Sequence, residues 1–288
     1  MSPASSQRRP APDGAGALLS HDSDVGSPLA LVTGATTGIG LELARLLARD
    51  GHALLLVART ASALQEVAAG LNPLGSAGVT TVAADLSREG GVELVMQALG
   101  GRPVAILINN AGHGGAGDFA GSDEAVVLSM LRLNIEALTL LSRRLLPGMI
   151  ARGRGRVLNV GSLAGFLPGP WHAIYYATKA YVLSFSEALA EETAGTGVTV
   201  TALCPGPVRT PFHARAGMGS RSASGLLAAM DADAAALAGY RAMMAGDPLV
   251  VPGPGSKAIT LLVRVLPRRL VARLAGKMQR RRMSGARS

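Results

Sequence analysis

Short runs of apolar residues alternate with longer amphipathic stretches along most of the chain. The runs cover residues 29–33, 53–58, 79–83, 104–109, 156–161 and 198–203, and most of them show no alternation of apolar and polar positions. A strand with this pattern is buried on both faces, as in a parallel sheet that helices cover. The chain is therefore predicted to form an α/β fold with a doubly wound, mostly parallel sheet and right-handed crossovers.

The stretches between these runs have the apolar spacing of surface helices. They predict helices over residues 40–50, 62–71, 89–99, 123–151 and 174–194, each with one apolar face on the sheet. The chain has 288 residues, of which 48% are hydrophobic. This is enough to bury one large core, so a single domain is expected.

The domain is expected over residues 28–255. Two segments of different composition flank it, and a third interrupts it. Residues 1–27 are rich in Ser, Pro, Ala and Gly without periodicity, which is typical of a disordered leader. Residues 211–247 are rich in Ala, Met and Gly and break the alternation, so they are predicted to form a helical lid over the carboxyl edge of the sheet. Residues 256–288 predict a basic amphipathic helical tail, which Pro267 should split.

The net charge of +9 comes from this tail. Residues 256–288 hold 10 of the 28 Lys and Arg residues and none of the 19 Asp and Glu residues, so the rest of the chain is close to neutral. Aromatic residues make up only 3% of the chain, too few for platforms that stack nucleic-acid bases. The composition therefore argues against a nucleic-acid partner.

Cysteine and histidine usage excludes further classes. Cys204 is the only cysteine, which forbids an intramolecular disulfide and argues against a thiolate metal cluster. The five His residues include no HxxxH spacing, so no metal site is expected. The sequence contains no run of 18 apolar residues and no signal-peptide stretch, and the expected location is the cytoplasm.

A glycine-rich turn follows the first apolar run. Residues 33–40 read TGATTGIG, and a helix is predicted directly after them. Glycines at such a turn let the backbone approach a ligand closely. The amino end of the helix then offers free N–H groups to a pyrophosphate.

Further motifs follow this turn in order. NNAG occupies residues 109–112 after the fourth run, Asn134 lies in a predicted helix, and Ser162 follows the fifth run. Tyr175 and Lys179 form YxxxK, and residues 205–210 match PGxVxT. Together with TGxxxGIG, these motifs resemble those of the short-chain dehydrogenase/reductase family over residues 29–210.

The resemblance implies a Rossmann-type fold and hydride transfer between a nicotinamide and a carbonyl or alcohol group. It implies catalytic roles for Asn134, Ser162, Tyr175 and Lys179, with Asn134 anchoring a water in a proton relay. It also implies a set of cofactor-binding residues, namely Gly34, Thr36, Gly38, Ile39, Gly40, Arg59, Asp85, Leu86, Asn110, Ala111, Gly112, Tyr175, Lys179, Pro205, Gly206, Val208 and Thr210.

The residue types at these positions suit the reaction. A free tyrosine has a pKa of about 10 and is a poor acid or base at neutral pH. Lys179 lies one helical turn after Tyr175, where its ammonium group would favour the phenolate. Tyr176 has no such partner because residue 180 is Ala. Ser162, at the carboxyl end of a strand, can donate to the substrate oxygen.

The end of the second run bears on the choice of cofactor. An NAD site has an acidic residue there for the ribose 2′-hydroxyl, whereas an Arg suits the 2′-phosphate of NADP. This chain has Ala58 followed by Arg59. NADP(H) is therefore the preferred cofactor, with NAD(H) as the alternative.

The leading hypothesis is an NADP(H)-dependent oxidoreductase that interconverts a carbonyl and a secondary alcohol. The alternative is a dinucleotide-binding sensor or scaffold that lost the chemistry, although the four catalytic residues are intact. A sugar-nucleotide epimerase or dehydratase is disfavoured by the TGxxxGIG turn. Apolar residues between Phe212 and Met244 predict a hydrophobic small-molecule substrate. Trp171 and His172 are expected to line its pocket.

Two interpretations of the tail remain open. Beyond Pro267, four apolar residues fall on one helical face and four basic residues on another, namely Leu270, Val271, Leu274, Met278, Arg269, Arg273, Lys277 and Arg280. The apolar stripe packs either on the protein itself or on a second subunit of a homo-oligomer. Alternatively, residues 267–283 attach peripherally to an anionic membrane.

Overall fold

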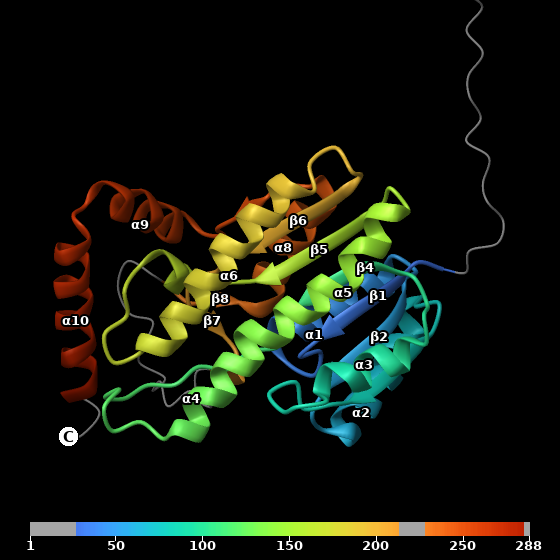
Figure 1. Ribbon diagram of the computed structural model, residues 1–288, viewed down its shortest axis with the longest axis horizontal. Helices are drawn as coiled ribbons and strands as arrows, with labels where there is room; N and C mark the ends of the chain where they lie inside the picture. Colours follow the sequence, from blue (N-terminus) through green and yellow to red (C-terminus); the bar gives the residue numbers. More distant parts are fainter. Residues whose placement is uncertain (1–26, 213–227, 285–288) are drawn as a thin grey trace, which may run out of the picture.

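A seven-stranded parallel sheet forms the centre of the protein (Figure 1). The computed structural model describes residues 27–212 and 228–284. The strand order is β3-β2-β1-β4-β5-β6-β9, which confirms the predicted doubly wound sheet. The strands are β1 (Leu29–Thr33), β2 (Ala53–Ala58), β3 (Val79–Ala83), β4 (Val104–Asn109), β5 (Gly155–Val160), β6 (Val198–Leu203) and β9 (Leu249–Val250).

Helices connect the strands and cover both faces of the sheet (Figure 1). They are α1 (Gly38–Arg49), α2 (Ala61–Leu71), α3 (Gly91–Leu99), α4 (Glu124–Leu131), α5 (Leu138–Ala151), α6 (Ala173–Glu192), α8 (Ala232–Ala245), α9 (Pro254–Val265) and α10 (Arg268–Ser284). A π-helical turn, Arg132–Ala137, joins α4 to α5. Two short strands, β7 (Val208–Arg209) and β8 (Met230–Asp231), pair outside the main sheet.

The core lies on both faces of the sheet, because successive side chains of a strand point to opposite faces. Leu31 of β1 packs in a cluster with residues of α3, α5 and α6. Val32, the next residue, packs in a second cluster with residues of α1, α2 and α8. Burial on both faces explains why the central strands lack polar alternation. The prediction of double burial is wrong at β3, an edge strand whose residues are only half-buried or exposed.

Part of the predicted lid is a core helix. Residues 213–227 lie outside the described residues, but α8 packs on α1 and β6. Met243 of α8 is fully buried in the cluster that includes Leu203, and the Tyr240 hydroxyl hydrogen-bonds to Asp50 at the end of α1. The interpretation of residues 232–245 as lid is therefore wrong. Their Ala-rich composition permits close packing of the helix against the sheet. The same composition is compatible with a lid, so the sequence alone does not distinguish the two.

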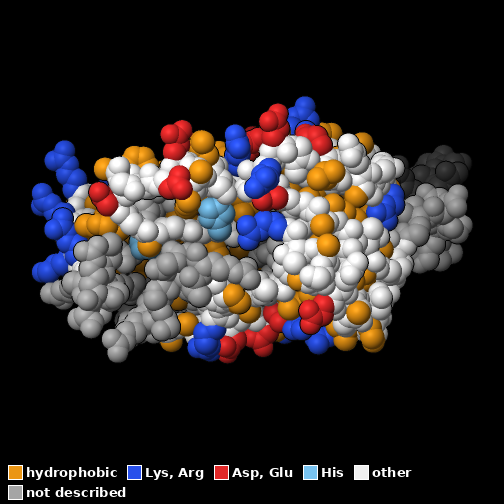
Figure 2. Space-filling view, turned by 90° about the horizontal axis from the view of Figure 1, so that it is seen from below, with side chains coloured by type: hydrophobic (Ala, Val, Ile, Leu, Met, Phe, Trp, Pro, Cys, Tyr) orange, Lys and Arg blue, Asp and Glu red, His pale blue; other side chains and the backbone are white. Residues whose placement is uncertain are grey.

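The tail divides at Pro267 into α9 and α10, as predicted. The two helices lie away from the sheet at one end of the protein (Figure 1). Lys and Arg side chains gather along the edge where α10 lies (Figure 2). Residues 1–26 of the predicted leader lie outside the described residues.

One helical stretch, Glu124–Ala151, is long and apolar enough to cross a membrane by length and composition. It spans α4, the π-helical turn and α5. Leu141 and Met149 of α5 are buried in the core against the sheet. This packing accounts for only part of the apolar composition, because Val126, Leu128 and Ile150 of the same stretch are exposed.

Gly40 should tolerate no side chain, because a Cβ there would lie 2.3 Å from both the Gly34 carbonyl oxygen and Asn110 Nδ2. We expect Gly40→Ala to lower the free energy of unfolding by at least about 3 kcal/mol, measured by urea denaturation. Gly70, in α2, is the matched control because a Cβ there meets nothing within 4 Å. Gly70→Ala should raise the stability by up to about 1 kcal/mol, and equal effects of the two variants would contradict the expected steric clash.

Candidate active site

The glycine-rich turn forms a tight cradle between β1 and α1. Gly34 and Gly38 have φ angles of 65° and 59°, which residues with a side chain rarely adopt. Gly40 lies so close to Gly34 that no Cβ fits between them. A Cβ at Gly38 would lie 2.9 Å from Thr210 Cγ2. The turn and the PGxVxT segment, far apart in sequence, therefore meet at this cradle.

Thr33 and Asn110 lock the cradle to the neighbouring strand. The Thr33 hydroxyl donates to the Ile108 carbonyl at 3.1 Å and accepts from the backbone N–H groups of Asn110 and Ala111, each at 3.0 Å. Asn110 Nδ2 donates to the carbonyls of Thr33 and Gly34, each at 3.0 Å. These bonds join the carboxyl ends of β1 and β4, where the strand order reverses and ligands bind in such sheets.

The amino end of α1 is suited to an anion. Thr37, the residue that caps it, makes no side-chain capping bond, and the first turn contains no acidic residue. The first N–H groups of a helix need partners, and a phosphate satisfies them. The cradle leaves room for backbone contact with a ligand but none for a side chain at Gly40. These residues fit the pyrophosphate of a dinucleotide.

Arg59 and Asp85 stand close together at the carboxyl ends of β2 and β3. Burial alone would raise the pKa of Asp85, but hydrogen bonds from Ser87 and the charges of Arg59 and Arg88 lower it below its usual value. Ser87 donates to Asp85 Oδ1 from its N–H at 3.0 Å and from its hydroxyl at 2.6 Å. The sequence motifs at the two strand ends are thus brought to one place.

Asn134 lies in the π-helical turn between α4 and α5 and is 2% exposed. Its Oδ1 accepts from the His113 N–H at 3.0 Å, and its Nδ2 donates to the His113 carbonyl at 2.9 Å. Nδ2 also donates to the Thr178 hydroxyl at 3.0 Å. Asn134 therefore fixes the loop after β4 to α6. Single π-helical turns are frequent at functional sites. This one places the amide of Asn134 between the loop after β4 and α6.

Lys179 is buried beside this amide. Its ammonium group donates to the Val160 carbonyl at 2.7 Å. A Cβ at Gly112 would lie 3.1 Å from Asn134 Oδ1 and 3.7 Å from Lys179 Nζ, so the backbone of the NNAG turn approaches both side chains closely. Burial lowers the pKa of Lys179 to about 8 because water no longer solvates the ammonium charge.

Tyr175 and Ser162 lie together at the carboxyl end of β5. Burial raises the pKa of Tyr175 to about 12, and a hydrogen bond with Ser162 opposes that rise. The Ser162 hydroxyl also accepts from the Ala164 N–H at 3.1 Å. In the protein as described, desolvation outweighs the factors that would favour the phenolate. The lowering of this pKa by Lys179 therefore stays a prediction.

Apolar side chains surround the Tyr175 ring. Met130 and Ala164 are buried in a cluster with it. The ring centroid of Phe212 lies 5.7 Å from that of Tyr175, and the Tyr176 ring packs edge-on at 6.0 Å. The phenol thus stands in an apolar environment, which strengthens its hydrogen bonds and electrostatic contacts.

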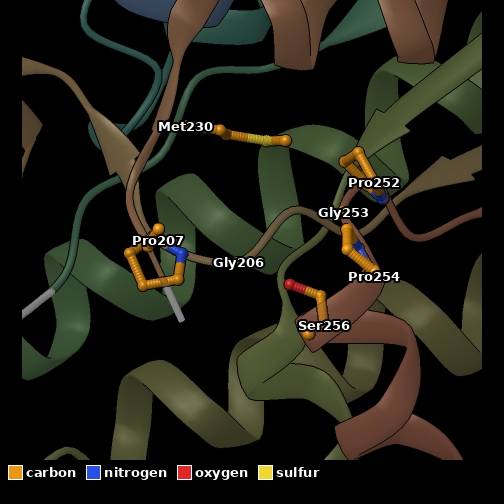
Figure 3. A pocket seen from close by; sticks show the side chains of 9 residues that line it. Gly206, Pro207, Met230, Pro252, Gly253, Pro254 and Ser256 are labelled. Atoms are coloured by element: carbon orange, nitrogen blue, oxygen red, sulfur yellow. The ribbon is translucent and has the colours of Figure 1, made fainter. Parts of the chain in front are cut away.

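An open cavity lies beside the PGxVxT segment (Figure 3). It has a volume of about 130 Å³ and is lined mainly by Gly, Pro and Met residues, with Ser256 as the polar exception. Gly206 and Pro207 form one side, and residues 252–256 form the other. Of the other predicted cofactor residues, Leu86 and Ala111 line one small pocket together with Thr33.

Three residues between the motifs shape the site. His172 is buried and contacts the Gly115 carbonyl through Nδ1 at 3.1 Å. Trp171 has a φ of 63°, a strained value for a bulky side chain, and its carbonyl accepts from the Gly117 N–H at 2.8 Å. His113 Nε2 contacts the Ser129 hydroxyl at 3.1 Å. The contacts of His172 and Trp171 join the loop after β4 to the segment before α6, and that of His113 joins the same loop to α4.

Thr178 and Thr33 are positioning residues that the sequence analysis did not single out. Thr178 is fully buried, donates to the Tyr175 carbonyl at 2.8 Å and accepts from Asn134. It therefore links the helix that carries Tyr175 and Lys179 to the π-helical turn. The only signal in the sequence was that Thr178 carries a hydroxyl inside the YxxxK motif. Spacing alone does not show that this hydroxyl meets the amide of Asn134, which is distant in the sequence.

The site contains no cluster suited to a metal. Among the residues that the structure describes, no group of three or more His, Cys, Asp or Glu side chains could hold a metal ion. Cys204 is buried, and burial raises the pKa of its thiol to about 12. A Cβ at Gly161 would lie 2.8 Å from Cys204 Sγ, so the cysteine serves as a small packing residue behind Ser162.

Comparison with known proteins identifies this arrangement. The sequence matches the short chain dehydrogenases over residues 28–219. The chain belongs to the short-chain dehydrogenase family. It is therefore an oxidoreductase that acts on CH–OH and C=O groups, built on the NAD(P)-binding fold of that family.

Several members of this family are similar over most of the chain. A protein named as a ketoacyl reductase of monensin polyketide synthase from Streptomyces virginiae is 39% identical over 203 residues, 68% of this chain and 77% of the relative. A short-chain dehydrogenase from Sphingobium yanoikuyae in complex with NADPH has a TM-score of 0.74 and 32% identity, covering 84% of this chain and 97% of its own. A bulky-bulky ketone specific alcohol dehydrogenase from Comamonas testosteroni has a TM-score of 0.71 and 28% identity, and the match covers 85% of this chain and 96% of that protein.

Burial of Lys179 should make stability depend on pH. Its pKa is about 8 in the folded protein against a usual 10.5, so between these values the unfolded chain binds more protons and the stability of the folded state should rise with pH. We expect the stability advantage of the parent over Lys179→Met to grow by about 2 kcal/mol from about pH 7 to 9.5.

Urea denaturation of the cofactor-free protein at the two pH values measures this change. Lys257→Met, which removes an exposed lysine of α9, is the control. The change should be confined to Lys179→Met. A stability difference that stays constant with pH would mean that the Lys179 ammonium is solvated in the folded protein.

Proposed function

We propose that the protein is an NADP(H)-dependent oxidoreductase that interconverts a carbonyl and a secondary alcohol on a hydrophobic substrate, with Tyr175 as acid/base. The observation that carries this proposal is the Tyr175 phenol, hydrogen-bonded to Ser162 in an apolar environment at the carboxyl edge of the sheet. Lys179 lies one helical turn on from the phenol. The group that supplies or accepts the hydride is the nicotinamide of the cofactor.

The chain's own residues move and hold the proton. A phenol whose pKa is about 12 stays protonated at neutral pH and is ready to donate to a carbonyl oxygen that gains negative charge. Ser162 orients this oxygen by a second hydrogen bond. The buried Lys179 ammonium would then stabilise the phenolate left behind. Asn134 joins the loop after β4 to α6 and would anchor a water on the path to solvent.

Arg59 is proposed to select NADP(H). Ala58 offers no carboxylate to a ribose 2′-hydroxyl, and the guanidinium of Arg59 is near the adenosine end of the predicted site, where it lowers the pKa of Asp85. A guanidinium binds a phosphate by paired, charge-assisted hydrogen bonds. The complex of the Sphingobium yanoikuyae relative with NADPH supports this choice.

A hydrophobic ketone is the proposed substrate. Met130 and Phe212 line the space around Tyr175, and the cavity beside Gly206 has room for a further apolar group. The names of two similar proteins, a ketoacyl reductase and an alcohol dehydrogenase specific for bulky ketones, support substrates of this class. Ketoacyl thioesters and bulky aromatic ketones are therefore the first compounds to assay.

Tyr175→Phe should abolish NADPH-dependent reduction of these compounds while leaving the NADPH dissociation constant within about threefold, because only the phenolic hydroxyl is removed. Turnover and cofactor fluorescence titration measure the two effects. Tyr176→Phe is the matched control, since it removes the neighbouring hydroxyl, and it should retain most of the activity. A Tyr175→Phe enzyme with more than about a tenth of the parent kcat would exclude the acid/base role. A parent that binds NADPH but reduces none of the panel would favour the non-catalytic alternative.

Arg59→Ala should reduce the preference for NADPH over NADH, expected to be about tenfold or more in the parent, to near parity. The ratio of kcat/KM for the two cofactors measures it. Arg88→Ala is the comparison, because Arg88 also lies beside Asp85 but is not at the end of β2. If Arg88→Ala instead removes the preference, Arg88 and not Arg59 reads the phosphate.

A further inference from the structure

The outward faces of α9 and α10 expose an unusual amount of apolar surface. Half of the large hydrophobic side chains that are exposed in the described part of the chain lie in these two helices. On α9, Leu261 and Val265 are 63% and 78% exposed; on α10, Leu274 and Met278 are 50% and 56% exposed. Residues four apart share a helical face, so each helix has an apolar stripe toward solvent. Contiguous exposed apolar surface marks an interaction site.

The opposite side of α10 already holds the helix on the protein. Val271 is buried, and a Cβ at Gly276 would lie 3.5 Å from Pro170 and 3.6 Å from Trp171. The Arg280 guanidinium lies over the Trp171 ring at 4.9 Å. Of the apolar stripe expected to pack on the protein or on a second subunit, only Val271 packs on the protein, whereas Leu270, Leu274 and Met278 are exposed. Gly276 makes the contact with Pro170 and Trp171, and the larger apolar side chains of α10 face solvent.

Basic residues flank the exposed stripe of α10. Arg269, Arg273 and Lys277 are exposed and alternate with the apolar positions. Residues 256–288 contain no Asp or Glu, so the described outward face has no charge of the opposite sign. Figure 2 shows this concentration of Lys and Arg at the end of the protein where α10 lies.

We propose that the outward faces of α9 and α10 bind the surface of an anionic lipid bilayer. Apolar side chains would enter the boundary between headgroups and acyl chains, and the flanking cations would contact lipid phosphates. A second copy of the chain is a poorer occupant. A symmetric interface would bring the same cations together without acidic partners. Nucleic acid would satisfy the cations but leave the Leu and Val side chains in water.

This surface is connected to the active site. The segment that α10 contacts, Pro170 and Trp171, comes directly before α6, which carries Tyr175 and Lys179. Its carbonyl at Trp171 bonds to Gly117 in the loop after β4. A bilayer bound to α10 would therefore lie next to the segment that borders the site. The proposal of a membrane surface does not depend on the proposed reaction.

Co-sedimentation of the full chain with lipid vesicles tests the proposal. We expect binding to phosphatidylcholine vesicles that contain phosphatidylglycerol, weakened by high salt, and little binding to phosphatidylcholine alone. The triple variant Arg269→Glu/Arg273→Glu/Lys277→Glu should bind on the order of a hundredfold more weakly, since each surface cation adds about fivefold. The control Arg49→Glu/Arg154→Glu/Arg241→Glu makes the same charge change on exposed arginines elsewhere and should keep most of the binding.

A second variant separates lipid from other anionic partners. Leu261→Gln/Val265→Gln/Leu274→Gln leaves the charge unchanged and should also lose vesicle binding, with thermal unfolding by circular dichroism confirming that it folds. Three results would overturn the proposal. The parent could fail to bind anionic vesicles; it could bind a DNA duplex more tightly than vesicles, with no effect of the apolar variant; or the arginine control could lose as much binding as the tail variant.

Discussion

The close approach of β1, α1 and β4 is the constraint on which the rest of the site depends. Gly40 lies against the Gly34 carbonyl, and Asn110 bridges the turn to the neighbouring strand. With Thr33 bonded to three backbone groups of β4 and its following turn, the two strand ends cannot separate. These hydrogen bonds preform the cradle, and a preformed site loses less entropy on binding. The absence of a Cβ at Gly40 makes this geometry attainable.

The proposed catalytic groups are held at a cost to stability. Tyr175 and Lys179 are both buried, and burial shifts their pKa values to about 12 and about 8. Each shift disfavours the charged form, and the Val160 carbonyl and Ser162 offset only part of the lost solvation. Such destabilised groups are typical of active sites. The proposed reaction uses the same desolvation, since a dry site strengthens the attraction between a phenolate and an ammonium.

The terminal helices extend the fold beyond the parallel sheet. Gly276 permits α10 to approach Pro170 and Trp171 closely, while the larger apolar residues of the helix face outward. Trp171 is positioned by contacts on two sides, from Gly117 and from α10. The helix α10 therefore contacts the segment that leads to α6 and also carries the surface proposed to bind lipid.

The sequence by itself determined the sheet and the order of the site motifs. Five of the six predicted strands have the observed bounds. For the central strands the reason is that burial on both faces leaves a mostly apolar run that is visible locally. The positions of Asn134, Ser162, Tyr175 and Lys179 also follow from spacing. Strand β9, with two residues, is too short to give such a signal.

Only the tertiary structure decided which groups meet. The bond from Asn134 to Thr178 joins residues 44 positions apart, and the Val160 carbonyl that holds Lys179 comes from another element. The packing of α8 on α1, and the outward direction of Leu274, likewise depend on the surroundings. An Ala-rich or amphipathic pattern specifies that a helix has a preferred face. It does not specify what that face contacts, because contact depends on residues distant in the sequence.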